Sequence, residues 1–329
     1  MTNTKAHVSP TWAKQKKTLV SRHRLGFCYM SLFIMILFFK NADAAALWVS
    51  EGLRLCAQKL IPSLFPFMVI SSLAISCGLG ELVTRILGRP FQLLFGIEGE
   101  GAVAVILGWI CGFPVGAKCA CELYGSQRIS HAECTRLLCI CGTPSPAFLI
   151  STVGGAMLGS RSQGLCLYLI SLTSSLILGV LLKFISPLPE RCGQSCAENA
   201  PPRSVGIAKS VTAAVCDSAR GMLCVCGFVV FFSAFLGVMR SALSFIAIPS
   251  TANSLLFAFF ELTTGLSAII GTGTALSLPL CALAVGWSGM SVHFQTISIC
   301  SAPVSFKPYF IAHAAKCALC FALGLLILC

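Results

Sequence analysis

The chain has 329 residues, of which 56% are hydrophobic and 10% are charged, and its formal net charge is +12. A soluble domain carries about 25% charged residues, so this composition excludes an ordinary soluble enzyme and a disordered chain. The fold class predicted is all-α, that of a polytopic membrane protein, because a membrane-spanning helix needs about 20 mostly apolar residues. We expect eight or nine transmembrane segments.

The first 24 residues form a basic tail directly before an apolar run. This tail contains no acidic residue, and its basic residues are Lys5, Lys14, Lys16, Lys17, Arg22 and Arg24. Basic residues beside a transmembrane helix stay in the cytoplasm, so residues 25–46 are predicted as a first, uncleaved helix with a cytoplasmic N-terminus. The positive charge therefore orients a multi-pass protein of the cell membrane and does not indicate a nucleic-acid partner.

Eight further apolar segments follow, and a polar stretch divides them into two membrane halves. The halves cover residues 50–186 and 211–329, and the linker between them covers 187–210. The predicted segments are 59–79, 101–121, 136–159, 164–186, 211–239, 253–275, 277–300 and 309–329.

Several of these segments contain residues that interrupt a helix. Gly112, Pro114 and Gly116 interrupt the segment 101–121, and Thr143 to Pro146 interrupt 136–159. Proline removes a helical hydrogen bond, and the freed groups are tolerated in a membrane only beside protein or a water-filled cavity. Broken helices of this kind are typical of secondary transporters.

The two halves show weak internal similarity. Residues 65–76 align with 226–237, and GWICG at 108–112 aligns with GWSG at 286–289. Internal repeats are expected in transporters, as parallel copies when each holds an even number of crossings and as inverted copies when the number is odd. Re-entrant hairpins among the broken segments would change this parity, so both arrangements stay open.

Two charges within the segment 101–121 and just after it are candidates for binding an anionic substrate. Lys118 and Glu122 are four residues apart and therefore share one helix face. An ammonium beside a broken helix suits a carboxylate ligand. The alternative is that the two residues pair with each other at the end of a helix.

Hydroxyl and amide groups near the breaks are candidates for the rest of a substrate site. Thr143 and Ser145 lie in one break, and Ser288, Ser291 and Gln295 lie in a polar stretch of the segment 277–300. Such groups suit a polar solute or a cation. The alternative for the first pair is a sharp turn between two helices.

Three residues are candidates for coupling to an ion. Glu261 is an isolated carboxylate in an apolar segment, and Thr264 follows it within one turn. Intramembrane ionisable residues often mark ion pathways, and His293 is a second candidate. The coupling ion would be a proton or sodium. The alternative for His293 is a packing role.

Enzymatic catalysis is not expected. The chain contains no G-x-x-x-x-G-K-[ST], H-E-x-x-H or G-x-S-x-G pattern. No cofactor and no metal are expected.

Together, five motifs resemble the YlbJ-type sporulation integral membrane proteins. These motifs are SLFPFMVISSLA at 63–74, GWICGFPVGAK at 108–118, ECTRLL at 133–138 with the following CGTPSPAF at 141–148, ELTTG at 261–265 and GWSGMSVHFQT at 286–296. The resemblance covers about residues 50–325. It implies two nucleoside-recognition Gate-like repeats and a distant relation to concentrative nucleoside transporters.

The resemblance implies a transporter-like protein of sporulation that moves dipicolinic acid across the membrane between mother cell and forespore, with the outer forespore membrane as its location. Membrane lipids, a small anion, a coupling cation and a second copy of the chain are the expected partners. One alternative is a nucleoside or nucleobase transporter, which predicts uncharged hydrogen-bonding groups at the centre. Another is a non-transporting assembly protein, which predicts broken helices packed shut.

Overall fold

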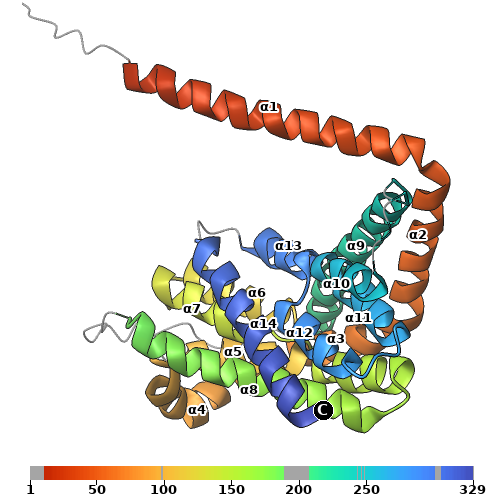
Figure 1. Cartoon of the computed structure of the whole chain (residues 1–329). Coiled ribbons are helices and arrows are strands. Elements are labelled where there is room, and N and C mark those ends of the chain that lie inside the picture. The colour runs from red at the N-terminus through yellow and green to blue at the C-terminus, as the bar shows by residue number, and fades with distance from the viewer. Residues whose placement is uncertain are drawn as a thin grey trace, which may run out of the picture.

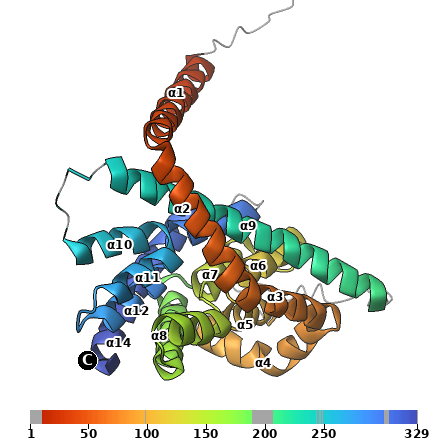
Figure 2. The ribbon, with the colours of Figure 1, turned by 90° about the vertical axis from the view of Figure 1, so that its right-hand side faces the viewer.

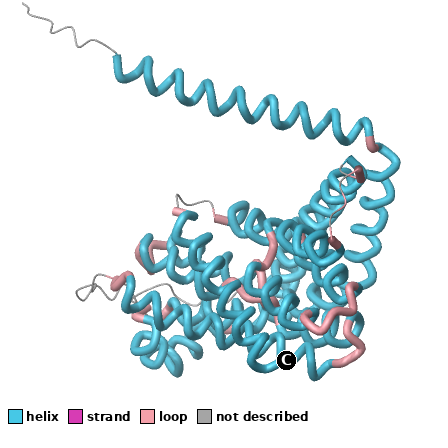
Figure 3. Tube along the Cα trace, viewed as in Figure 1, coloured by secondary structure: helices cyan, strands magenta, loops and turns pink. Residues whose placement is uncertain are grey.

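The computed structural model describes residues 11–97, 99–188, 207–242, 244–245, 247, 249–300 and 305–328. All regular elements in these ranges are helices (Figure 3), which confirms the predicted all-α class. Residues 1–10 of the predicted tail and 189–206 of the predicted linker lie outside the described residues. Five helical stretches of the described chain are long and apolar enough to cross a membrane: Ala42–Ala74, Arg161–Ile185, Ala208–Ala242, Ser277–Ile299 and Phe306–Leu328.

The N-terminal part of the described chain consists of a projecting helix and a long span. Helix α1 (Thr11–Lys40) extends away from the body (Figure 1). The span contains α2 (Ala42–Leu55), the π-helical turn η1 (Cys56–Leu60) and α3 (Ile61–Ser76). The segment predicted at 59–79 therefore begins 17 residues after the observed start of this span at Ala42. Polar residues of α2 hid the earlier half.

The predicted segment 101–121 is not one span but a hairpin of two short helices. After the amphipathic helix α4 (Leu79–Phe95), α5 (Gly101–Cys111) and α6 (Val115–Gly125) pack against each other. Each has 11 residues, which extend about 16 Å at 1.5 Å per residue and cover about half of a 30 Å bilayer core. The chain therefore turns back within the segment.

The next predicted segment is a broken helix, as the sequence indicated. Helix α7 (His131–Cys141) ends at Gly142, and the π-helical η2 (Ala147–Met157) begins after Pro146. The continuous helix α8 (Arg161–Ile185) completes this half.

Apart from α4, which has no counterpart, the second half repeats the order of elements of the first. That helix is α9 (Ile207–Ala242), and a hairpin of α10 (Ser250–Phe260) and α11 (Leu262–Gly271) follows it. The predicted segment 253–275 is thus also a hairpin. Then come a broken helix, made of α12 (Ser277–Trp287) and α13 (Met290–Ile299), and the continuous helix α14 (Phe306–Leu328).

One predicted internal match is not supported by this order of elements. GWICG ends the first helix of a hairpin, whereas GWSG lies at the break of a broken helix. The two motifs share a composition that permits close approach of backbones, but they occupy different elements.

Helices from both halves pack together. Helix α2 lies across α9 (Figure 2), and Trp48 covers Gly237, where an added Cβ would lie 2.1 Å from the indole Cδ1. Helix α14 packs against α12, α8 and α7. Buried Arg136 donates hydrogen bonds to the carbonyl oxygens of Phe95 (3.0 Å), Gly96 (3.2 Å), Leu182 (3.3 Å) and Ser186, and so satisfies the C-terminal ends of α4 and α8.

The first hairpin depends on glycine at its contact with α7. An added Cβ at Gly108 would lie 2.3 Å from the carbonyl oxygen of Cys141, which is backbone and cannot rotate away. We expect Gly108→Ala to lower the free energy of unfolding by about 1–3 kcal/mol, because overpacking forces the backbone to shift.

The measurement is the thermal unfolding midpoint of the purified protein in detergent. Gly227→Ala in α9 is the matched control, since no atom lies within 4 Å of the added Cβ. An equal midpoint for the two variants would contradict this account of the hairpin.

Candidate functional site

The four interruptions of the apolar segments lie against one another in two pairs. An added Cβ at Gly112, at the tip of the first hairpin, would lie 2.5 Å from the backbone nitrogen of Ser145 in the first broken helix. An added Cβ at Gly289, in the second broken helix, would lie 3.0 Å from the backbone nitrogen of Leu262 in the second hairpin. Each hairpin tip therefore contacts the break of the broken helix that follows it.

A small cavity, here called the central pocket, lies where these breaks meet. It holds about 50 Å³, and its polar lining residues are Ser145, Glu261, Thr263, Ser291 and Gln295. The remaining wall is mostly apolar and includes Leu60 of η1, Leu64 of α3 and Val225 and Val229 of α9. Liquid water occupies about 30 Å³ per molecule, so the pocket has room for one or two waters or an ion.

Four of the residues that the sequence analysis predicted as site residues line this pocket, namely Ser145, Glu261, Ser291 and Gln295. They come from elements that are as much as 150 residues apart in the chain, because 295 − 145 = 150. Three of the predicted substrate residues, Ser145, Ser291 and Gln295, therefore lie together with Glu261, which was predicted for ion coupling.

The polar groups of the first break are satisfied locally. The Thr143 hydroxyl is buried and donates to the carbonyl oxygen of Gly108 at 3.0 Å. The Ser145 hydroxyl accepts a hydrogen bond from the backbone N–H of Phe148 at 3.2 Å, which is the role of an N-cap residue for η2. Gly112 and Gly116 provide the close packing around this break, and Gly116 lies against Gly108. Pro114 precedes α6.

Glu261 forms the cap of the second hairpin's returning helix. Its side chain is 2% exposed, and its carboxylate accepts hydrogen bonds from the backbone N–H groups of Thr263 (3.0 Å) and Thr264 (2.6 Å). The extended backbone of Glu261 is typical of an N-cap residue. The negative charge also lies at the positive end of the α11 dipole, which stabilises it.

The second break depends on two residues in the left-handed region. Ser288 has φ of +77° and Gly289 has φ of +84°, and the Ser288 hydroxyl donates to the carbonyl oxygen of Val285. The Gln295 amide then donates to the Ser291 hydroxyl at 3.3 Å. Ser288 is fully buried but does not line the central pocket.

Lys118 and Glu122 lie outside the central pocket. Their side chains are 48% and 67% exposed, and the two charges are 3.8 Å apart on α6. This arrangement matches the alternative interpretation, in which the residues pair with each other at a helix end. A pair so exposed contributes little to stability.

A buried cluster behind the break of α7 contains residues that the sequence analysis missed. Lys316 of α14 is 0% exposed, and its ammonium donates to the carbonyl oxygen of Gly142 at 2.7 Å. His293, the third predicted coupling residue, hydrogen-bonds Tyr309 through Nδ1 at 2.8 Å and does not reach the central pocket. A lysine in the middle of the apolar segment 309–329 was the available signal.

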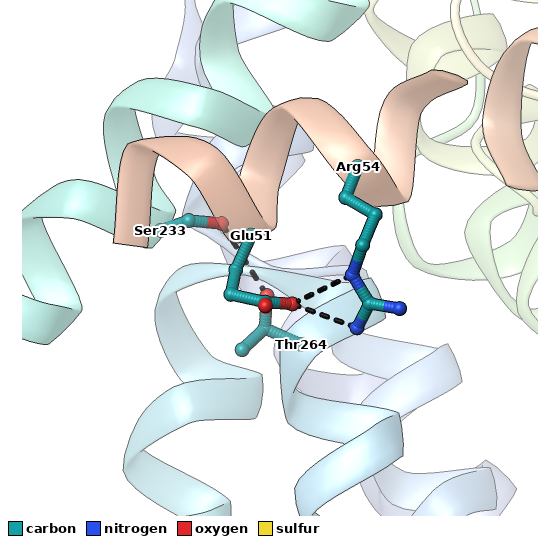
Figure 4. Close-up of polar contacts among 4 residues, drawn as sticks. All are labelled: Glu51, Arg54, Ser233 and Thr264. Carbon is teal, nitrogen blue, oxygen red and sulfur yellow. Dashed lines mark hydrogen bonds and ion pairs between the residues drawn. The ribbon is translucent and has the colours of Figure 1, made fainter. Parts of the chain in front are cut away.

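A second and larger cavity, here called the outer cavity, adjoins the central pocket. It measures about 610 Å³, and its charged lining residues are Glu51, Arg54, Lys59 and Arg240. Glu51 pairs with Arg54 at 2.7 Å, and the hydroxyls of Ser233 and Thr264 are 3.5 Å apart (Figure 4). Thr264 lines this cavity and its neighbour Thr263 lines the central pocket, so the second hairpin separates the two.

The capping role of Glu261 predicts a specific pattern of stability. Glu261→Ala removes the acceptor of two backbone N–H groups and should lower the free energy of unfolding by about 0.5–2 kcal/mol. Glu261→Ser keeps a capping oxygen and should retain more of that stability. Thermal unfolding of both variants in detergent checks this, and equal losses would show that the charge, rather than the cap, is what α11 needs.

Comparison with known proteins supports the resemblance drawn from the motifs. The chain is 26% identical over 315 residues to the sporulation integral membrane protein YlbJ of Bacillus subtilis (strain 168), and the match covers 85% of this chain and 77% of that protein. No family model matches the chain, and no solved structure matches it. The apolar helices and this similarity identify a multi-pass integral membrane protein that resembles YlbJ-type sporulation proteins.

Proposed function

We propose that the protein is a transporter that moves a small anionic solute, such as dipicolinic acid, across a membrane of the sporulating cell by alternating access. The observation that carries this proposal is the convergence of four helix breaks on one small pocket with five polar lining residues, beside a cavity lined by three basic residues. Broken helices that meet near the middle of a membrane are the places where secondary transporters bind substrate and ions.

The order of elements supports an inverted pair of Gate-like repeats. In each half a long span, a hairpin, a broken helix and a final long helix follow one another, with α4 as an addition in the first half. In this proposal the span, the broken helix and the final helix cross the membrane, and the hairpin returns to its own side. Three crossings place the second half in the opposite orientation to the first. Two such halves can rock against each other around the central pocket and expose it to one side of the membrane at a time.

The charges of the outer cavity support an anionic solute. Three cations, Arg54, Lys59 and Arg240, face one carboxylate, that of Glu51, so the lining carries a net charge of 3 − 1 = +2. Guanidinium groups bind carboxylates through two parallel hydrogen bonds. The cavity volume of about 610 Å³ lies within the range of small-molecule sites, whereas the central pocket at 50 Å³ does not.

In this proposal the solute enters through the outer cavity and reaches Ser145, Ser291 and Gln295 when the halves move apart. Glu261 and Thr264, at the boundary between the two cavities, are placed to respond to a coupling cation there. The N-terminus lies in the cytoplasm, and the outer forespore membrane is the proposed location.

A nucleoside or nucleobase is the second candidate substrate. Apart from Glu261, the polar groups of the central pocket are uncharged hydroxyl and amide groups, as this alternative predicts. A non-transporting assembly protein is the third candidate, and it predicts broken helices packed shut. The close packing around the central pocket of about 50 Å³ agrees with that prediction, whereas the outer cavity of about 610 Å³, which the broken helices do not line, favours a protein that binds a solute.

Uptake into proteoliposomes tests the proposal. The wild type should take up labelled dipicolinate in preference to uridine. Arg240→Gln should reduce dipicolinate uptake at low concentration about tenfold, because a charge-assisted hydrogen bond contributes about 1.5–3 kcal/mol.

Arg85→Gln on α4 makes the same substitution away from both cavities and is the matched control. Lys118→Gln tests the substrate contact that the sequence analysis predicted for Lys118. Because Lys118 lies outside both cavities, we expect this substitution to change dipicolinate uptake little. Uptake of uridine without uptake of dipicolinate would assign the protein to the second candidate.

A further inference from the structure

Lys316 is an ammonium buried in the middle of a membrane helix. It lies 11 residues into α14, since the helix begins at Phe306, and its side chain is 0% exposed. A buried charge is costly unless a partner compensates it. Here the partner is the carbonyl oxygen of Gly142, at 2.7 Å.

No carboxylate among the described residues pairs with Lys316. The titratable groups that face it are Cys141 of α7 and His313 and Cys320 of α14, with His293 of α13 beyond His313. Helices α8 and α12 contribute Ser174, which accepts from Cys320, and Gly286, which lies against the backbone of Lys316. The ammonium is therefore held by a carbonyl group and by the helix end to which that carbonyl belongs.

Gly142 is the residue at which α7 stops. The carbonyl groups at the C-terminal end of a helix have no partners within it and carry a partial negative charge. In transporters with broken helices, such ends and unwound carbonyls coordinate the coupling cation. Lys316 brings a covalently attached cation to this position.

The same stripe of α14 contains further ionisable groups. Tyr309, His313, Lys316 and Cys320 follow one another at helical spacings of four, three and four residues, and all are buried. The His313 ring lies against Gly142, where an added Cβ would be 2.8 Å from its Cε1. The ring centroids of His313 and His293 are 5.0 Å apart, and Nδ1 of His293 hydrogen-bonds the hydroxyl of Tyr309.

The break that Lys316 contacts also forms the central pocket. Gly142 begins the interruption, and Pro144 and Ser145 in the same interruption line the pocket. Loss of the ammonium charge would remove the attraction between α14 and the end of α7. The charge on Lys316 is thus mechanically linked to the residues that face the solute.

We propose that Lys316, rather than Glu261 and Thr264, is the site that couples transport, and that it does so by binding a proton in place of a bound sodium ion. In each cycle the ammonium releases one proton to water and becomes a neutral amine, which frees the α7 break to move, and it takes up one proton again when the protein has reoriented. Both protonation states are accessible to a buried lysine. This inference rests on the proposed function, because it needs a solute whose movement is coupled.

The experiment uses the full chain in proteoliposomes with labelled dipicolinate as the probe. Exchange of labelled for unlabelled dipicolinate, without any ion gradient, measures solute movement alone. Accumulation under a pH gradient or under a sodium gradient measures coupling. For the wild type we expect exchange, and accumulation that responds to the pH gradient and not to the sodium gradient.

Lys316→Gln keeps a hydrogen-bond donor for the carbonyl oxygen of Gly142, but its amide cannot take up and release a proton as the lysine amine does. We expect its exchange to stay within about threefold of the wild type and its response to the pH gradient to be lost. Lys183→Gln is the matched control, because Lys183 of α8 also donates to a backbone carbonyl, that of Leu93 at 2.5 Å, but lies outside this cluster. It should keep both activities.

Two outcomes overturn the inference and leave the proposed function intact. In the first, Lys316→Gln still responds to the pH gradient. In the second, the wild type accumulates dipicolinate with a sodium gradient and not with a pH gradient. A wild type without exchange overturns the proposed function and this inference with it. Lys316→Met is the second variant. If neither variant folds, the response of the wild type to the pH gradient and to the sodium gradient still tests the inference, because a response to sodium alone contradicts it.

Discussion

The structure depends on one constraint, which is that backbone groups freed by a helix break cannot be left without partners in a membrane. Four breaks would expose many such groups if each faced lipid. Here the breaks pack against one another and against buried hydroxyl groups instead. Thr143 donates to Gly108, Ser145 caps η2 and Glu261 caps α11. The need to satisfy the backbone therefore gathers the polar groups of both halves into one interior site.

Close packing at this site requires residues without side chains. An added Cβ at Gly265 would lie 2.1 Å from the Cα of Ala258, so the second hairpin closes only with glycine there, as the first does at Gly108 and Gly116. Such contact between backbones leaves a central pocket of about 50 Å³ and no more. A solute can enter it only if the helices move, and a site closed in this way is what alternating access requires at one stage of its cycle.

Charge is distributed in a manner that separates three tasks. In the proposed function the basic residues that line the outer cavity attract an anion, while the central pocket offers mainly uncharged polar groups. Lys316 lies behind the pocket, where it contacts the break and not the solute. Placing the coupling charge behind the pocket allows the protonation state to alter the backbone around the solute without competing for the solute itself.

Several features followed from local sequence because their causes are local. Scarce charge and long apolar segments predicted an all-α membrane protein, and proline and glycine placed the interruptions at 112–116 and 143–146. Ser145, Glu261, Ser291 and Gln295 were identified as site residues because polar groups in apolar segments have few alternatives. The start of α2 was missed, since its polar residues face the outer cavity and lower the hydropathy of a true span.

The tertiary structure alone decided which apolar segments are hairpins and which charges are buried. Residues 101–121 and 253–275 have the length and hydropathy of a span, and only the packing of α5 on α6 and of α10 on α11 reveals hairpins. Lys118 and Lys316 both lie within or beside apolar segments, yet one pairs with Glu122 at the surface and the other is sealed against Gly142. Composition reports how much charge a chain contains, and burial depends on which helix faces lie together after folding.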